Sequence, residues 1–217
     1  GTGKELVARA IGLSGFVPFL EDKLAFAGNP GDGLFPLHLA ATSQSLVESV
    51  LFGHKKGSFT GALEDREGVF AACPPWGTVF LDEVGELDVT LQTKLLRVLE
   101  TRDFVPLGAN ASGRFRGRIV AATNRELPRE IEAGRFRRDL YFRLAGVVVR
   151  TPTLAQRIEE DADELGRLVG YLAAQIAGDG EGAALAAAVG RALPSVPRGH
   201  RWPGNVRELR NFVEAAL

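Results

Sequence analysis

The stretch "GTVFLDE" at residues 77–83 decides the fold. It is an unbroken apolar run that ends in two acids, Asp82 and Glu83, and such a run is typical of a strand buried on both faces of a parallel sheet. Residues 118–124, "RIVAATN", and 146–151, "GVVVRT", have the same character and predict two more strands. Ligands of open α/β sheets bind beyond the carboxyl ends of the strands, so the two acids are the first candidates for a site.

Helical patterns lie between these strands. Apolar residues recur at helical spacing in three segments, residues 4–13, 45–52 and 88–101. The apolar side of the first helix would consist of Leu6, Val7, Ala10 and Ile11. A short extended run is predicted at residues 35–39. This alternation predicts an α/β fold, a mostly parallel sheet with helices on both faces.

The character of the sequence changes after Pro152, where no strand pattern is visible. We expect a helix over residues 159–176, a break at "GDGEG" (178–182) and an alanine-rich helix over residues 183–193. A final helix follows, with Asn205 as its predicted N-cap. The sequence therefore predicts two domains, residues 1–152 and a small helical domain at residues 153–217.

Composition limits the function. The net charge of −1 lacks the basic excess of a general nucleic-acid surface, so bare DNA is not the expected partner. Cys73 is the single cysteine, which excludes an internal disulfide and favours a reducing, cytoplasmic setting. No apolar run approaches the roughly 18 residues of a membrane span. The sequence has no methionine, and both of its ends read as cut, so we expect a piece of a longer protein.

The opening "GTGK" runs directly into a helix, and it predicts a phosphate site. Glycines before a helix let backbone N–H groups and the helix dipole face a phosphate, with Lys4 on its oxygens. A plain glycine-rich N-cap would look the same, and Glu5 stands where a Mg²⁺-binding hydroxyl is usual. Asp82 and Glu83 alone could be solvated acids at the end of a strand. Together with this opening they favour a nucleoside triphosphatase, because one acid can hold Mg²⁺ while the other orients water.

Other polar residues are candidates with open alternatives. Asn124 ends the strand at 118–124 and either positions the attacking water or simply starts a loop. Arg137 and Arg143, in "RFRRDLYFR", are either solvated or act as arginine fingers on a neighbouring subunit. Spacing alone does not choose between these interpretations.

Several motifs occur in one order: "GTGKEL", "ESVLFGHKKGSFTGA", "GTVFLDEVGEL", "LQTKLLRVLE", "GRFRRDLYFRL" and "WPGNVRELRN". Together they resemble the AAA+ domain of bacterial enhancer-binding proteins, the activators of sigma-54 RNA polymerase. The resemblance covers nearly the whole chain, and "GSFTGA" is its most specific part. It implies a P-loop AAA+ parallel sheet flanked by helices (1–152), truncated at its N-terminus, and a C-terminally truncated helical lid (153–217).

The resemblance also implies roles for single residues. Gly1, Thr2, Gly3 and Lys4 would cradle the ATP phosphates, with Glu5 as a further residue of the nucleotide-binding segment. Asp82 would hold Mg²⁺, and Glu83 would polarise water. Thr123 and Asn124 match the first sensor, Arg207 the second. Arg137 and Arg143 match the fingers that act in trans, so ATP would be hydrolysed between subunits of a homo-oligomeric ring, usually a hexamer.

The sigma-54 contact implied by the resemblance is a loop made of Gly57, Ser58, Phe59, Thr60, Gly61 and Ala62. A permanently exposed phenylalanine is a liability, whereas one exposed only in the ATP-bound state is a switched contact. The flanking glycines let the loop swing without steric cost. A glycine-rich hairpin with a buried phenylalanine is the alternative. DNA would be bound only through a C-terminal domain outside this sequence, and no membrane contact is implied.

The chain departs from the family pattern at Ser58, Ala155 and His38. Ser58 replaces the usual alanine of the loop, and Ala155 stands where relatives commonly carry arginine. His38 stands where the family usually has an asparagine that pairs with the catalytic glutamate. Two rival functions remain: an AAA+ remodeller of another protein, and a degenerate ATPase that only binds and scaffolds.

Overall fold

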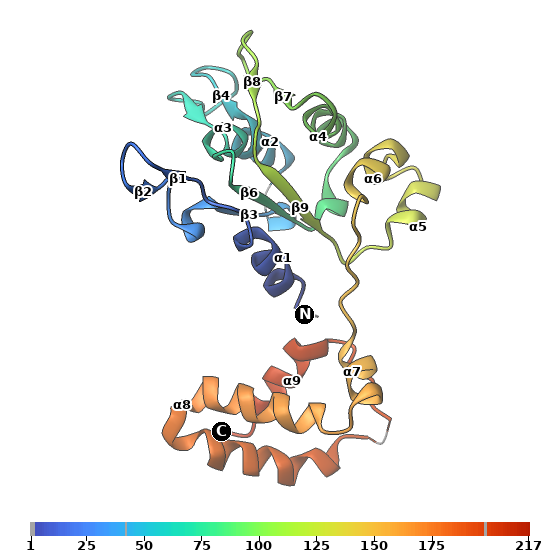
Figure 1. The fold of residues 1–217 in the computed structure, drawn as a ribbon. Helices are drawn as coiled ribbons and strands as arrows, with labels where there is room; N and C mark the ends of the chain where they lie inside the picture. Colours follow the sequence, from blue (N-terminus) through green and yellow to red (C-terminus); the bar gives the residue numbers. More distant parts are fainter. Residues whose placement is uncertain (1–2, 42, 198) are drawn as a thin grey trace. The chain divides into compact units, whose positions relative to one another are not determined.

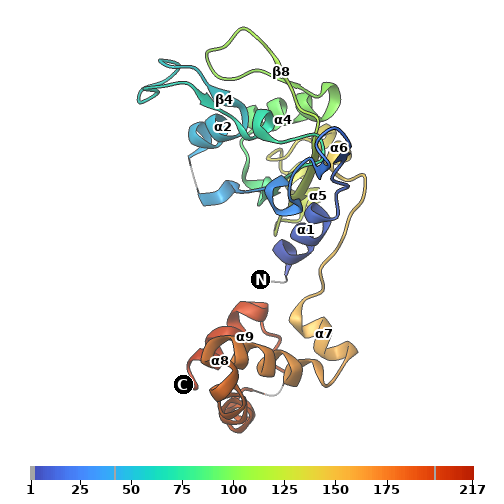
Figure 2. The ribbon, with the colours of Figure 1, turned by 60° about the vertical axis from the view of Figure 1, so that its left-hand side comes forward.

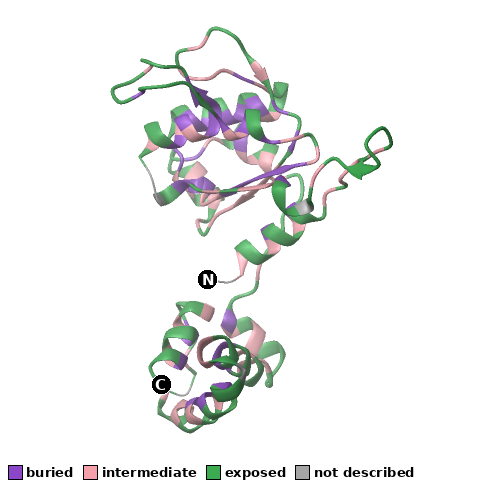
Figure 3. Cartoon of the chain, turned by 90° about the vertical axis from the view of Figure 1, so that its left-hand side faces the viewer, coloured by how far each residue is buried: buried purple, intermediate pink, exposed green. Residues whose placement is uncertain are grey.

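The computed structural model describes residues 3–41, 43–197 and 199–217 (Figure 1). The described chain divides into two compact units: one contains residues 5–148, the other residues 3–4 and 149–217. Each unit has its own apolar core, and Figure 3 shows buried segments concentrated inside each of them. The predicted boundary after Pro152 lies near this division and stays a prediction.

The first unit contains a parallel three-stranded sheet in the order β3-β6-β9. Its strands are β3 (Leu34–His38), β6 (Thr78–Asp82) and β9 (Arg118–Ala122). Val79, Phe80 and Leu81 of the central strand are at most 1% exposed, as expected for a strand covered on both faces. His38, Asp82 and Ala122 are partners in the register, so the three carboxyl ends lie side by side.

Helices cover both faces of this sheet (Figures 1 and 2). On one face lies α1 (Lys4–Leu13), where Thr78 Oγ1 donates to the carbonyl oxygen of Gly12 at 3.3 Å. Val79 and Leu81 face the other side, where they share a core with α2 (Gln44–Phe52), α3 (Val69–Ala72) and α4 (Val89–Thr101). The predicted α/β class is confirmed.

Shorter elements complete the first unit. Antiparallel pairs are formed by β1 (Phe19–Leu20) with β2 (Ala25–Phe26), β4 (Gly53–His54) with β5 (Arg66–Glu67), and β7 (Asp103–Phe104) with β8 (Gly113–Arg114). The remaining helices are η1 (Pro30–Gly33), η2 (Leu39–Ala41), η3 (Val84–Glu86), α5 (Leu127–Glu132) and α6 (Arg138–Leu144).

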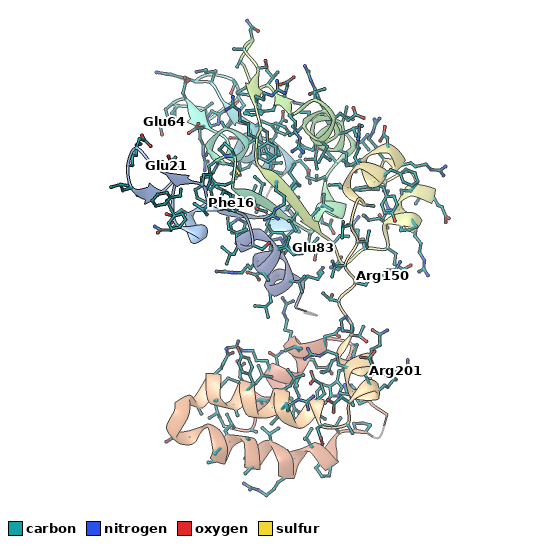
Figure 4. The ribbon with its side chains drawn as sticks, in the orientation of Figure 1. Phe16, Glu21, Glu64, Glu83, Arg150 and Arg201 are labelled. Carbon is teal, nitrogen blue, oxygen red and sulfur yellow. The ribbon has the colours of Figure 1, made fainter. Side chains whose placement is uncertain are left out.

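The β1–β2 hairpin stands out from its unit, and Figure 4 labels Glu21 at its turn. Its base is fixed by Trp76. A Cβ added at Gly33 would lie 2.2 Å from the indole ring, and one added at Gly28 would lie 2.6 Å from it. Only glycine allows the backbone to approach the ring this closely.

The second unit is helical. It contains α7 (Leu154–Glu160), α8 (Glu164–Ala192), η4 (Leu193–Ser195) and α9 (Asn205–Glu214). Leu172, Val189 and Leu209 are among its fully or nearly buried residues. Gly178 has a non-helical backbone (φ 78°, ψ 173°) and divides α8 into two arms, so the predicted break in "GDGEG" is confirmed.

Three local predictions are wrong. Residues 146–151 form no strand and pair with none of β3, β6 and β9. Val147, Val148 and Val149 are 87%, 61% and 58% exposed. An apolar run becomes a strand only where a neighbour satisfies its backbone N–H and C=O groups.

The predicted helix over 159–176 is interrupted, because α7 ends at Glu160 and α8 begins at Glu164. The Asp161 carboxylate accepts from the backbone N–H of Asp163 in this turn, a local bond with which aspartate competes against helix continuation. Asn205 is not the N-cap of α9, a position held by Gly204. Asn205 Oδ1 instead accepts from Leu154 N at 2.7 Å, a bond that joins α9 to the start of α7.

Candidate functional site

The carboxyl ends of the parallel strands bring the predicted acids together with the candidate first-sensor residues. Asp82 ends β6, and Asn124 follows β9, the neighbouring strand. Glu83, labelled in Figure 4, comes directly after β6, and its Oε2 accepts from Asn124 N at 2.9 Å. Glu83 also has a left-handed backbone (φ 60°, ψ 49°), which is uncommon for a non-glycine residue. Such strained positions concentrate at functional sites.

A charged network fixes the turn after Asn124. Arg125 Nε donates to Glu86 at 2.8 Å, and its guanidinium also contacts Glu130 at 3.2 Å. Arg135 donates to both oxygens of Glu130 at 2.8 Å, and these bonds lower the pKa of the Glu130 carboxyl to about 2. Thr123 Oγ1 accepts from Arg125 N at 3.1 Å. The candidate sensor segment, Thr123 and Asn124, is therefore held in place by the contacts of the residue that follows it, Arg125.

Asp82 suits a magnesium ion whose other ligands are mainly phosphate oxygens and waters. Magnesium is commonly bound by one or two carboxylates together with substrate phosphates and waters. Within the described ranges, no group of three or more His, Cys, Asp or Glu side chains could hold a metal ion by itself. A single half-buried aspartate at the sheet edge fits the first arrangement.

The candidate phosphate helix is α1. Gly3 has a positive φ of 84°, which glycine adopts without strain, and Lys4 is the first helical residue, followed by the exposed Glu5. Gly1 and Thr2 lie outside the described residues. The far end of α1 is capped by Arg118, which donates to the carbonyl oxygens of Ile11 at 2.6 Å and Gly12 at 3.3 Å. A cation at this end complements the helix dipole.

The Leu6 face predicted for α1 is wrong. Leu6 is 73% exposed, and the buried residues of the helix are Ala8 and Gly12. A Cβ at Gly12 would lie 2.6 Å from Leu34 Cδ1, so the helix meets the sheet through its smallest residues. Apolarity alone does not reveal such a close contact.

Arg137 precedes α6 and is held by its neighbours. Its guanidinium pairs with Asp139 at 2.6 Å and donates to Thr93 Oγ1 at 3.2 Å. The pKa of the Asp139 carboxyl is lowered, mainly by its hydrogen bond with the Arg137 guanidinium. The backbone N–H of Arg137 donates to Gln92 Oε1 at 2.8 Å. Gln92 is fully buried, and its Nε2 donates to Leu87 O at 2.8 Å and Arg135 O at 2.9 Å.

Sequence reasoning missed Gln92 and Arg125, since each has a partner about forty residues away in the chain, Arg135 for Gln92 and Glu86 for Arg125. A polar residue among the leucines of "LQTKLLRVLE" was the available signal for Gln92. An amide at a buried helical position must find partners for its donors and acceptor.

Arg143 lies on α6 with its side chain 57% exposed, and its Nε is 3.8 Å from the Glu100 carboxylate. Phe142 beside it is 69% exposed. A shallow hollow of about 500 Å³ is lined by Arg137, Arg138, Asp139 and Phe142. Arg207 is exposed on α9, in the other unit.

The predicted partner loop is the tip of the β4–β5 hairpin. Gly57 N donates to Ala62 O at 2.9 Å, and both Gly57 (φ 79°) and Gly61 (φ 99°) have positive φ. Thr60 is exposed, and Phe59 is 37% exposed, so the alternative of a buried phenylalanine is not what the structure has. The turn therefore presents an aromatic ring and a hydroxyl on a glycine-bounded loop.

Comparison with known proteins gives a family. The profile of the family described as "Sigma-54 interaction domain" matches residues 1–150. The Nif-specific regulatory protein of Azotobacter vinelandii is 43% identical over 99% of the chain and 37% of its own length. The transcriptional regulatory protein ZraR of Escherichia coli K12 is 41% identical over 100% of the chain and 45% of its own length. The chain thus spans less than half of these relatives.

Among solved structures, that of NtrX from Brucella abortus matches with a TM-score of 0.74 and 31% identity, over 99% of the chain and 44% of NtrX. The structure of NtrX in complex with ATP matches with a TM-score of 0.72 and 30% identity, over 99% of the chain and 42% of NtrX. Within the described ranges, no helix is both long and apolar enough to cross a membrane.

Proposed function

From the premise that the chain belongs to the family of sigma-54 interaction domains, found in sigma-54-dependent transcriptional regulators, we propose that it hydrolyses ATP to remodel sigma-54 RNA polymerase. The observation that carries the proposal is the sheet edge, where the Glu83 carboxylate is held 2.9 Å from Asn124 N beside Asp82. An acid with a fixed direction at this position can take a proton from water.

In the proposed reaction, water attacks the γ-phosphorus of ATP while the bond to the β,γ-bridging oxygen breaks, which yields ADP and phosphate. Glu83 accepts the proton of the attacking water, and Asn124 positions that water. Gly1, Thr2, Gly3 and Lys4 cradle the phosphates, and Glu5 belongs to the same nucleotide-binding segment. Magnesium, held by Asp82, would neutralise developing charge on the phosphate oxygens.

Arg137 and Arg143 are proposed to act on ATP bound to the next subunit of a homo-oligomeric ring, a hexamer by family resemblance. Both lie at the exposed α6 surface, where arginines can reach another subunit. Asp139 holds Arg137 within its own chain, so that ion pair must open or rotate when a phosphate is offered. Arg207, on the proposed lid, would sense the nucleotide from its own chain.

The contact with sigma-54 is proposed for residues 57–62, with Phe59 and Thr60 at the tip. The exposure of Thr60 and the positive φ angles of Gly57 and Gly61 support this assignment. A ligand shifts a loop only if it binds two loop positions unequally, so ATP must favour the position that meets sigma-54. DNA would be bound through another domain of the whole cytoplasmic protein.

Two variants of the whole protein test the proposal. Glu83→Gln should lower ATP turnover by about 10²- to 10⁴-fold, because it removes the proton acceptor, while ATP still binds. Thr60→Ala should retain turnover and lose sigma-54 binding in a pull-down, whereas Thr90→Ala, an exposed threonine on α4, should keep both. Unchanged turnover in Glu83→Gln removes that residue from its role, and intact binding in Thr60→Ala removes the loop from its role.

A scaffold without turnover is the second candidate. It is favoured by His38, which stands beside Asp82 in the register of the sheet, in place of the family's asparagine. Ala155, on α7 in place of the family's arginine, is consistent with it. A phosphate-release assay on the whole unmodified protein decides between the two candidates.

A further inference from the structure

The base of the β4–β5 hairpin contains a buried histidine that the proposed function leaves unused. His54 is only 8% exposed, and its Nδ1 shares a hydrogen bond of 2.7 Å with Oγ of the fully buried Ser49. Its ring meets Phe59 edge to face, with ring centroids 5.0 Å apart and an interplanar angle of 68°. Histidine thus joins the core of α2 to the loop tip.

We propose that His54 is a positioning residue that docks Phe59 against the hairpin base, and that Ser58 opposes this docking. The proposal rests on the role proposed above for Phe59 as a sigma-54 contact. In this proposal His54 stabilises the docked loop and Ser58 destabilises it.

His54 cannot follow the loop, because β4 is bonded on both sides. Besides its pairing with β5, β4 meets Leu107, whose N–H donates to Gly53 O at 3.0 Å, while Lys55 N donates to Leu107 O at 2.9 Å. Phe59, in contrast, lies within a turn bounded by Gly57 and Gly61. Motion of the turn therefore changes the distance between a fixed imidazole and a mobile ring.

Ser58, in contrast, favours the released loop. Its Oγ is buried and makes no hydrogen bond in the described part of the chain. A Cβ added at Gly108 would lie 2.7 Å from Ser58 Cβ, so the segment after β7 closes directly over the serine. A buried hydroxyl without a partner is unfavourable, and water restores its hydrogen bonds when the loop is released. An alanine at this position would carry no such penalty.

The two residues predict opposite effects. Removing an aromatic edge-to-face pair should raise the ratio of released to docked loop by about two- to twelvefold. Removing the orphan hydroxyl with Ser58→Ala should lower that ratio, by about fivefold or more. Since only the released loop would bind sigma-54, its apparent affinity without nucleotide should follow the same ratio until release is complete.

The test uses the whole protein with 4-fluorophenylalanine at position 59 and ¹⁹F NMR without nucleotide. In His54→Ala the fluorine signal should move towards its solvent-exposed position, and in Ser58→Ala it should move the other way. The double variant Ser49→Ala/His54→Phe keeps a ring beside Phe59 without a polar group, and should retain the docked signal. An unmoved signal in a folded His54→Ala protein overturns the proposal, as does a shift of Ser58→Ala towards exposure.

The fluorine measurement does not involve sigma-54, so the two proposals can fail separately. If the signals move as expected but Phe59→Ala binds sigma-54 normally, the docking stands and the partner role of the loop fails. If Phe59→Ala loses binding while the fluorine signal ignores His54, the partner role stands and the docking fails. Should His54→Ala not fold, the Ser58→Ala spectrum alone decides.

Discussion

Replacement of Gln92 by leucine should destabilise the protein strongly, although leucine suits a buried helical position. Gln92 makes three hydrogen bonds of 2.8–2.9 Å to main-chain groups, Leu87 O, Arg135 O and Arg137 N. Gln92→Leu leaves two carbonyl oxygens and one N–H without these partners, Leu87 O in a buried bond and Arg135 O and Arg137 N in part-buried ones. Each orphaned group costs about 1–3 kcal/mol, and the larger apolar surface of leucine returns part of the loss.

The expected net loss is about 3 kcal/mol or more in the free energy of unfolding, a large part of the 5–15 kcal/mol typical of a domain. Urea unfolding followed by circular dichroism measures it, with Gln175→Leu as control, since Gln175 is an exposed helical glutamine whose Nε2 bonds Tyr171. A loss below about 1 kcal/mol would refute the reasoning, because one buried and two part-buried groups cannot lose their partners at so small a cost. Maximal ATPase rate should also fall, since Gln92 fixes the backbone of Arg137.

Three further predictions follow from single contacts. Arg118→Gln removes the cap on the last turn of α1, so the free energy of unfolding, measured in urea, should fall by about 0.3–1 kcal/mol. The lowered pKa of Glu130, about 2 against roughly 4.3 when unfolded, supplies stability that is present above the unfolded pKa and lost as pH falls towards 2. Glu130→Gln should therefore flatten the decline in urea midpoint between about pH 5 and pH 3. Gly68→Ala would place Cβ 2.2 Å from Gly53 N and should lower the melting temperature, whereas Gly190→Ala, with open space on α8, should raise it slightly.

Those parts of the fold that depend on short stretches of sequence could be predicted. The strands at 78–82 and 118–122 each contain their own apolar run, and α4 carries its own periodicity and its own N-cap, Asp88, whose side chain accepts from Leu91 N at 2.7 Å. Residues 146–151 have the same local character as β9 but no strand beside them. Strand formation depends on a neighbour, which composition does not report.

Some residues of the candidate site could be predicted from the sequence, and others could not. Asp82 and Glu83 were visible because they end a predicted strand, and the parallel register brings Asn124 to them. Gln92 and Arg125 were not, because each has a partner about forty residues away in the chain. His54 was not either, although its partners Ser49 and Phe59 are only five residues away, because the sequence does not show that its ring is buried between them. The sequence shows that a polar residue occupies an apolar segment, but the partner that satisfies it appears only in three dimensions.

The contacts of α2 connect the candidate catalytic edge, at Glu83, with the proposed partner loop, residues 57–62. At its start, Gln44 Nε2 donates to Glu86 O at 3.0 Å and Gln44 Oε1 accepts from Asp88 N at 3.2 Å, in the segment directly after Glu83. Near its end, Ser49 bonds His54, whose ring meets Phe59. A nine-residue helix is about 13 Å long and moves as one body, so a shift of the segment after Glu83 that carries Gln44 also carries Ser49. The hydrogen bond between Ser49 and His54 is therefore anchored on the same helix that bonds the segment after Glu83, at the candidate catalytic edge.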